Sequence, residues 1–140
     1  MFELKTEATI ENLAKVTAFV EDHLAEAGIS LMNTTGICIA VEEIYVNIAN
    51  YAYSPGTGDV TIRIDTKMDR SKVFIIFEDH GIPYNPLEKE DPDISLSLEE
   101  RQIGGLGIFM TKQFMDEIIY EYKDNSNILT LIKNIDQNEE

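Results

Sequence analysis

The sequence predicts one α+β domain, a two-layer sandwich in which helices cover one face of a mixed, mostly antiparallel sheet. Apolar residues repeat with the period of a helix from about residue 9 to residue 53, and most later segments alternate as strands do. Helices thus precede strands instead of alternating with them throughout, which is typical of the α+β class. A length of 140 residues with 44% hydrophobic content suffices for one core, so a single domain is expected over residues 1–140.

The N-terminal part contains a short strand pattern followed by two helix patterns. Phe2–Lys5 alternates, and a helix is expected from about Thr9 until Gly28, a typical C-terminal stop. Its predicted apolar face consists of Leu13, Val16, Val20, Leu24 and Ala27. A second helix is expected after Ser30 and ends at the loop over residues 53–58. Its apolar stripe consists of Ile37, Val41, Ile44 and Ile48.

The remaining elements are mainly strands. Residues 60–64 alternate as a half-buried strand does, and Asp69-Arg70-Ser71 is the expected turn. Val73–Phe77 is apolar at every position, which predicts a central, covered strand that delivers Asp79 to the end of the sheet. A helix is expected over Leu106–Met115. The last two strands, residues 118–122 and 128–132, are expected to form a hairpin with its turn at residues 124–127.

The charge of the chain excludes one class of partner and constrains another. Twenty-six acidic and 11 basic residues give a formal charge of −15, which opposes binding to a nucleic acid backbone. The same charge repels a free nucleotide polyphosphate, so any nucleotide site requires a divalent cation such as Mg²⁺.

Cysteine content and hydropathy indicate the compartment. The single cysteine, Cys38, permits neither an internal disulfide nor a cysteine cluster for metal. No apolar run approaches the roughly 20 residues of a membrane span, and the acidic N-terminus does not resemble a secretory signal. A cytoplasmic protein without a membrane partner is therefore expected.

A long irregular segment, about residues 82–103, is the first candidate for function. It contains three prolines and no sustained periodicity, and loops of this length are commonly functional covers or disordered insertions. Asp79-His80-Gly81 precedes it and Gly104-Gly105-Leu106-Gly107 follows it. A glycine cluster that opens a helix can direct backbone amides at a phosphate, so the segment is interpreted as a nucleotide lid.

Two residues of the second predicted helix suit a catalytic site. Glu43 and Asn47 lie one turn apart beside the apolar stripe, with the small residues Gly36 and Ala40 on the same side. A carboxylate and a carboxamide in this arrangement can hold an activated hydroxyl together with a metal ion. The alternative is a solvated helix edge, because this spacing is frequent by chance.

The other candidates have similar alternatives. Asp79 is either part of a turn or a buried acceptor for the exocyclic amine of adenine, with Gly81 permitting close approach of the base. The glycines at 104, 105 and 107 form either a hinge or a phosphate cradle. Arg101 and Lys112 flank that turn, as phosphate ligands or as plain surface charges. Tyr51 and Tyr53 are predicted to be core or rim aromatics.

Three segments together resemble the sequence boxes of a known superfamily. Glu43-Ile44-Tyr45-Val46-Asn47, Asp79-His80-Gly81-Ile82-Pro83 and Gly104-Gly105-Leu106-Gly107 resemble, in this order, the N, G1 and G2 boxes of the Bergerat-fold (GHKL) ATPases. Within that superfamily the chain is most similar to the stand-alone anti-sigma factor serine kinases of bacteria, from about Leu4 to Lys133. Glu99–Ile103, before the last box, strengthens this assignment.

The resemblance implies a role for each matching residue. Asn47 would help to coordinate Mg²⁺, Asp79 would contact adenine, and Glu43 would be the catalytic base. Gly81, Gly104, Gly105, Leu106 and Gly107 would shape the nucleotide pocket, and Arg101 would reach the phosphates from the lid. One departure concerns the pocket rim, since Tyr51 stands where many relatives have a histidine.

The resemblance also implies the reaction and its partners. ATP would phosphorylate a serine or threonine of an anti-anti-sigma (STAS-like) protein, and a sigma factor or an equivalent regulator would be a second partner. A homodimer is expected by analogy only. Two alternatives stay open: a catalytically silent ATP-binding module that sequesters a partner, and a purely structural domain whose glycines are turns.

Overall fold

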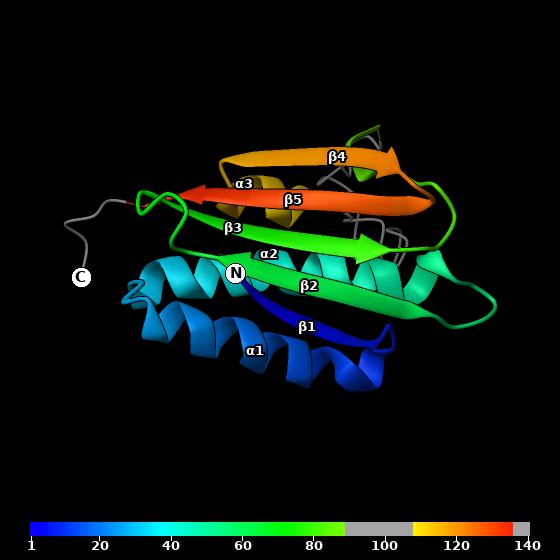
Figure 1. The fold of residues 1–140 in the computed structure, drawn as a ribbon, viewed down its shortest axis with the longest axis horizontal. Helices are drawn as coiled ribbons and strands as arrows, with labels where there is room; N and C mark the ends of the chain where they lie inside the picture. The colour runs from blue at the N-terminus through cyan, green and yellow to red at the C-terminus, as the bar shows by residue number, and fades with distance from the viewer. Residues whose placement is uncertain (89–107, 136–140) are drawn as a thin grey trace, which may run out of the picture.

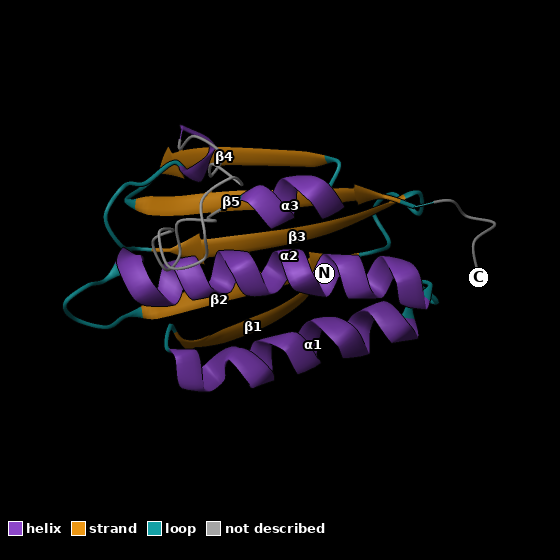
Figure 2. Ribbon diagram, turned by 180° about the vertical axis from the view of Figure 1, so that it is seen from behind, coloured by secondary structure: helices purple, strands orange, loops and turns teal. Residues whose placement is uncertain are grey.

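The computed structural model describes residues 1–88 and 108–135, and they form two layers (Figure 1). A five-stranded sheet has the order β1-β2-β3-β5-β4, and its four pairings are all antiparallel. The strands are β1 (Phe2–Glu7), β2 (Asp59–Asp65), β3 (Lys72–Asp79), β4 (Glu117–Lys123) and β5 (Ser126–Asn134). Helices α1 (Leu13–Glu26), α2 (Leu31–Asn47) and α3 (Phe109–Phe114) all cover one face of the sheet (Figure 2). The predicted α+β class is confirmed.

The first two helices bury the apolar stripes that their spacing predicts. Val16, Val20 and Leu24 of α1 are fully buried, whereas Ala27 is exposed at the C-cap, contrary to the prediction. The chain turns away there, because Gly28 has a φ of +77° that ends the helix. Helix α2 begins at the Ser30 cap, whose hydroxyl accepts a hydrogen bond from the Asn33 N–H at 3.1 Å.

Helix α2 does not run unchanged to the loop at residues 53–58. Its regular part ends at Asn47, and a π-helical turn, η2 (Ile48–Ala52), follows. Turns of this kind are frequent at functional sites. Two short 3-10 turns, η1 (Ile10–Asn12) and η3 (Pro86–Glu88), complete the described elements.

Strand β3 occupies the centre of the sheet, as predicted. Val73, Ile75 and Phe77 are buried against the helices. Its opposite face, with Phe74 and Ile76, is only partly buried, because the helices lie on one side alone. The expectation of a strand covered on both faces is therefore wrong for that side. Among residues 1–88 and 108–135, no helix is both long and apolar enough to cross a membrane.

The C-terminal hairpin forms with a tighter turn than predicted. Asp124 and Asn125 take positive φ values of 53° and 63°, as the two central residues of a type I′ turn require. The predicted turn at residues 124–127 is too long, because Ser126 and Asn127 belong to β5, where Asn127 lies opposite Asp79 of β3. This register carries a polar side chain of β5 to the end of the sheet where the candidate site lies.

Candidate functional site

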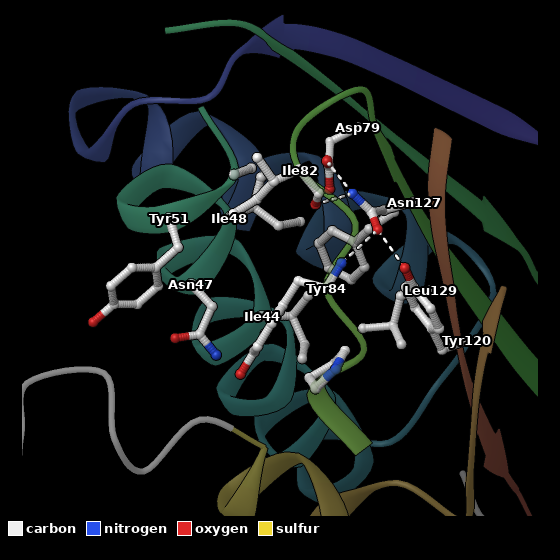
Figure 3. A pocket seen from close by; sticks show the side chains of 13 residues that line it. Ile44, Asn47, Ile48, Tyr51, Asp79, Ile82, Tyr84, Tyr120, Asn127 and Leu129 are labelled. Atoms are coloured by element: carbon white, nitrogen blue, oxygen red, sulfur yellow. Dashed lines mark hydrogen bonds between the residues drawn. The ribbon is translucent and has the colours of Figure 1, made fainter. Parts of the chain in front are cut away.

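A cavity of about 330 Å³ opens at the end of β3, between the C-terminal part of α2 and strands β4 and β5 (Figure 3). It is lined by Ile44, Asn47, Ile48, Tyr51, Ala52, Phe77, Asp79, Ile82, Tyr84, Pro86, Tyr120, Asn127 and Leu129. Apolar side chains form most of the wall, and a few polar groups converge in it. Small-molecule sites in proteins have this composition and a volume upward of about 300 Å³.

Asp79 supplies the buried carboxylate of this cavity. The residue is 5% exposed, and Oδ1 accepts hydrogen bonds from the Gly81 N–H at 2.9 Å and from Asn127 Nδ2 at 3.0 Å. Burial raises the pKa of this carboxyl, and the two hydrogen bonds oppose that rise. Because both bonds use Oδ1, Oδ2 is the oxygen that can accept a hydrogen bond from a bound ligand.

Asn127 is the site residue that sequence reasoning missed. Its Nδ2 donates to Asp79 Oδ1 and, at 2.8 Å, to the Ile82 carbonyl oxygen. Its Oδ1 accepts hydrogen bonds from the Tyr84 N–H at 3.1 Å and from the Tyr120 hydroxyl. One carboxamide thereby connects β3, β4, β5 and the segment after β3 (Figure 3). No local pattern of the sequence marks this role, which follows from the strand register that pairs Asn127 with Asp79.

Gly81 allows a close approach, and the partner in this structure is protein backbone. A Cβ at this position would lie 2.2 Å from the carbonyl oxygen of Ala52 in η2. That oxygen accepts a hydrogen bond from the Ile82 N–H at 3.0 Å. The absence of a side chain at residue 81 therefore lets the segment after β3 pack directly on η2, which sets one wall of the cavity.

Tyr51 lies at the rim of the cavity and Tyr53 packs against the core, which agrees with the prediction of core or rim aromatics. Tyr51 lines the cavity and is 44% exposed. The Tyr53 hydroxyl donates to the Asp59 carbonyl at 2.6 Å and accepts from the His80 N–H at 2.7 Å. Tyr53 thus ties the start of β2 to the residue after β3, beside Asp79.

Glu43 and Asn47 project from α2 one turn apart, but they differ in surroundings. Asn47 lines the cavity, whereas Glu43 is not one of the lining residues. Glu43 Oε1 accepts hydrogen bonds from the Thr111 N–H at 2.7 Å and from the Thr111 hydroxyl at 2.8 Å. Glu43 Oε2 lies 3.4 Å from the Met110 nitrogen. Half-burial raises the pKa of the Glu43 carboxyl, and these donors of α3 oppose the rise.

Comparison with known proteins decides the family. The model of the histidine kinase-like ATPase domain matches residues 6–133 of this chain. The chain belongs to this family. Membership implies that this histidine kinase-like ATPase domain binds ATP.

Curated relatives of the domain are protein kinases. The serine/threonine-protein kinase BtrW of Bordetella bronchiseptica is 30% identical over 95 residues, which are 68% of this chain and 66% of BtrW. The serine-protein kinase RsbW of Bacillus cereus is 23% identical over 129 residues, which are 91% of this chain and 81% of RsbW. The expected resemblance to the serine kinases and the expected enzyme class are both borne out by these relatives.

A solved structure has the same fold. The crystal structure of the RsbU and RsbW domains of Rv1364c from Mycobacterium tuberculosis matches with a TM-score of 0.61 at 17% identity. The match covers 96% of this chain and 32% of that longer chain. At this level of identity the likeness supports the architecture alone.

Part of the predicted site lies outside the described residues. Arg101, Gly104, Gly105, Leu106 and Gly107 fall there, as does the lid segment from residue 89 to residue 103. The helix predicted over Leu106–Met115 is present as α3, Phe109–Phe114. At the other end of the predicted lid, Tyr84 and Pro86 line the cavity. The described residues thus bring together Asn47, Asp79 and Gly81 of the predicted set, with Glu43 one helical turn away.

Proposed function

We propose that this histidine kinase-like ATPase domain transfers the terminal phosphoryl group of ATP to a serine or threonine of an anti-anti-sigma (STAS-like) partner. A sigma factor or an equivalent regulator is its second partner, with partner choice set by nucleotide state. The observation that carries the proposal is the apolar cavity with the buried Asp79 carboxylate inside it and Asn47 on its wall. The kinase names of the relatives support the reaction.

Adenine recognition is assigned to the end of β3. Asp79 Oδ2 accepts a hydrogen bond from the exocyclic amine of adenine, because Oδ1 already binds Gly81 and Asn127. A guanine ring presents a carbonyl oxygen in place of that amine, and a carboxylate repels it. Aromatic and aliphatic side chains of the cavity wall pack against the base.

The metal and the phosphates are assigned to α2 and to the segment that precedes α3. Mg²⁺ is usually held by one or two protein oxygens, with phosphates and water completing its shell. The Asn47 carboxamide oxygen on the cavity wall fits that requirement. Within residues 1–88 and 108–135, no cluster of three acidic, histidine or cysteine side chains offers another metal site. Gly104, Gly105, Leu106, Gly107 and Arg101 remain the proposed phosphate ligands.

Glu43 is the proposed base. When bound, Mg·ATP supplies an activated phosphoryl group, and most catalysis of its transfer comes from positioning and charge neutralisation. The Glu43 carboxylate would accept the proton of the acceptor hydroxyl as the new oxygen–phosphorus bond forms and the bond from the γ-phosphorus to the β,γ-bridging oxygen breaks, which releases ADP. Its raised pKa strengthens it as a base relative to an exposed glutamate.

Binding is tested by thermal unfolding with Mg·ATP. At about a hundred times its dissociation constant, Mg·ATP should stabilise the protein by roughly 2.7 kcal/mol, which is several degrees in Tm. Asn47→Ala is expected to abolish the increase, and Asn33→Ala, at the opposite end of α2, is the matched control. An unchanged melting curve for the natural sequence would reject every ATP-dependent function.

Phosphoryl transfer is tested by incubating the protein with γ-labelled ATP and a lysate of its own host. The expected product is one labelled small protein, which sequencing would identify. Glu43→Gln should keep the Tm increase with Mg·ATP and lose the labelling, because the amide cannot accept the proton. Undiminished labelling by Glu43→Gln would remove Glu43 as the base.

A catalytically silent module that sequesters its partner is the second candidate. The observation that favours it is the engagement of the Glu43 carboxylate by three donors of α3 rather than by the cavity. Such a module would show the Tm increase with Mg·ATP and label no protein at all. A module of this kind has no need of a base, so Glu43 itself favours the kinase.

A further inference from the structure

The contact between Glu43 and Thr111 joins two helices through a buried hydroxyl. Thr111 is fully buried, and its Oγ1 lies 2.8 Å from Glu43 Oε1 and 3.3 Å from the carbonyl oxygen of Ala40. Its backbone N–H donates to the same Oε1 at 2.7 Å. A fully buried hydroxyl directed at a half-buried carboxylate is costly unless the bond is made, so this arrangement is specific.

We propose that Thr111 is a positioning residue for Glu43, whose hydroxyl holds Oε1 so that Oε2 is the oxygen that takes the substrate proton. The inference rests on the proposed function, in which Glu43 is the base. Two short bonds occupy Oε1, while the 3.4 Å contact of Oε2 with the Met110 nitrogen is weak. The proton affinity is therefore concentrated on Oε2, and the side chain cannot rotate away from α3 without leaving buried donors unpaired.

The second acceptor near Thr111 lets the hydroxyl serve both charge states of Glu43. While Glu43 is ionised, the Thr111 O–H donates to Oε1, a charge-assisted bond. After Glu43 gains a proton, the hydroxyl can rotate and donate to the Ala40 carbonyl oxygen at 3.3 Å. Valine, which has the same shape and no hydroxyl, offers neither bond. Thr111 thus favours the ionised base without trapping the product of proton transfer in an unsatisfied state.

Charged neighbours do not account for the raised pKa of the Glu43 carboxyl. The titratable groups on the elements that pack against α2 are Lys112 on α3, Tyr51 on η2, and Lys15, Glu21, Asp22, His23 and Glu26 on α1; α2 itself carries Cys38, Glu42 and Tyr45 besides Glu43. Glu21 and Glu42 act instead on Cys38, since burial first and then these two carboxylates raise the pKa of its thiol to about 11. Burial and the donors of Met110 and Thr111 are what shift the pKa of Glu43. The Thr111 hydroxyl is the one side-chain donor among them.

The test is a carbon-13 NMR titration of the glutamate carboxyl groups in the full chain without nucleotide. The Glu43 signal is assigned by its loss in Glu43→Gln. Thr111→Val removes the hydroxyl and keeps the backbone N–H, so the Glu43 pKa should rise by about one unit, the size expected for a charge-assisted bond. Thr111→Ser restores the hydroxyl and should return the pKa to its original value.

A matched control separates this contact from general effects of removing a hydroxyl. Thr17→Val on α1 removes the Thr17 hydroxyl, which lies 3.5 Å from Glu42 Oε1, and should leave the Glu43 titration unchanged. If Thr111→Val does not fold, Thr111→Ala, which only removes atoms, replaces it. An unshifted Glu43 signal in the folded variant, or an equal shift in Thr111→Ser, would overturn the inference.

The titration also separates this inference from the proposed function, because it requires no kinase activity. With γ-labelled Mg·ATP and the host lysate, the acidic limb of the labelling rate should move to higher pH in Thr111→Val by the shift that NMR measures. If Glu43→Gln still labels protein, the base is elsewhere and the proposed function fails. If Glu43→Gln is inactive while Thr111→Val keeps both the pKa and the pH profile, only the role of Thr111 fails.

Discussion

At the scale of single residues, the site concentrates the polar groups that an apolar core ordinarily excludes. Asp79 and Asn127 are both buried, at 5% and 7% exposure, and each satisfies part of the other's hydrogen-bonding capacity. Burial of the Asp79 carboxylate costs stability, because its charged form is disfavoured away from water. That cost is understandable only if the carboxylate has a function when the cavity is filled.

Asp79→Asn should separate the function of this carboxylate from its cost. The amide keeps Oδ1 for Gly81 and Asn127 and replaces Oδ2 with a donor, so the Tm increase with Mg·ATP should disappear. The pKa of the Asp79 carboxyl is higher in the folded state than in the unfolded state. The Asp79 side chain therefore contributes its full stability below the unfolded pKa, and this contribution is lost as pH rises through the folded pKa. The variant should therefore equal or exceed the natural protein in stability at pH 7, by up to about 1 kcal/mol, in urea unfolding.

The comparison across pH provides the check on Asp79→Asn. The stability gain of Asp79→Asn should vanish below about pH 3.8, the ordinary pKa of an aspartate in the unfolded chain. There the Asp79 carboxyl of the natural protein is uncharged in both the folded and the unfolded state. Asp59→Asn, at an exposed position of β2, is the control and should keep the Tm increase with Mg·ATP. A large loss of stability at pH 7 in Asp79→Asn would show that the carboxylate serves the fold rather than a ligand.

At the scale of elements, the cavity depends on how the end of β3 meets η2. The π turn displaces the chain after Asn47, and its last residue, Ala52, accepts a hydrogen bond from Ile82. Gly81 makes that approach possible, and Tyr53 fixes the same junction from the other side through His80. The wall of the cavity is thus a junction between two elements that are separated in the sequence by the loop and β2.

Gly81→Ala should disrupt this junction. The added Cβ would stand 2.2 Å from the Ala52 carbonyl oxygen, and backbone cannot yield as a flexible side chain can. We expect a loss of at least about 2 kcal/mol in the free energy of unfolding and a much smaller Tm increase with Mg·ATP. Gly56→Ala is the control, because its Cβ would have an ordinary 3.4 Å contact with the Tyr53 carbonyl oxygen. Equal stability of the two variants would contradict the packing role of Gly81.

At the scale of the whole molecule, charge governs which form of the nucleotide can bind. The chain carries a formal charge of −15, and a free triphosphate adds further negative charge to the same cavity region. Divalent cations neutralise the phosphates, and salt screens the remaining repulsion over about 10 Å at 0.1 M. Binding of the base and binding of the phosphates should therefore respond differently to ions.

The dependence on ions can be measured by titration calorimetry with ATP and with adenosine. Chelation of divalent cations by EDTA should weaken ATP binding tenfold or more, which corresponds to about 1.4 kcal/mol. Adenosine, which has no charge, should bind equally well with and without Mg²⁺. If EDTA leaves ATP affinity unchanged, the phosphates do not depend on a metal ion, and the role proposed for Asn47 is wrong.

Much of the architecture is present in the sequence itself. The apolar spacing of α1 and α2, the alternation in β2 and the short turn before β5 are properties of neighbouring residues, so they are visible without a structure. The spacing of four also places Glu43 and Asn47 one turn apart on any regular helix. Asp79 follows from its position at the end of an apolar strand.

Only the tertiary structure decided which of these groups meet. Asn127 reaches Asp79 across 48 residues, and Thr111 reaches Glu43 across 68. Neither contact is encoded by a local pattern, because strand register and helix packing depend on every element that competes for the same surface. Periodicity reports how one segment turns about its own axis. Contacts between segments are settled only when the whole chain closes around its core, and the surroundings of Asp79 and Glu43 arise at that step.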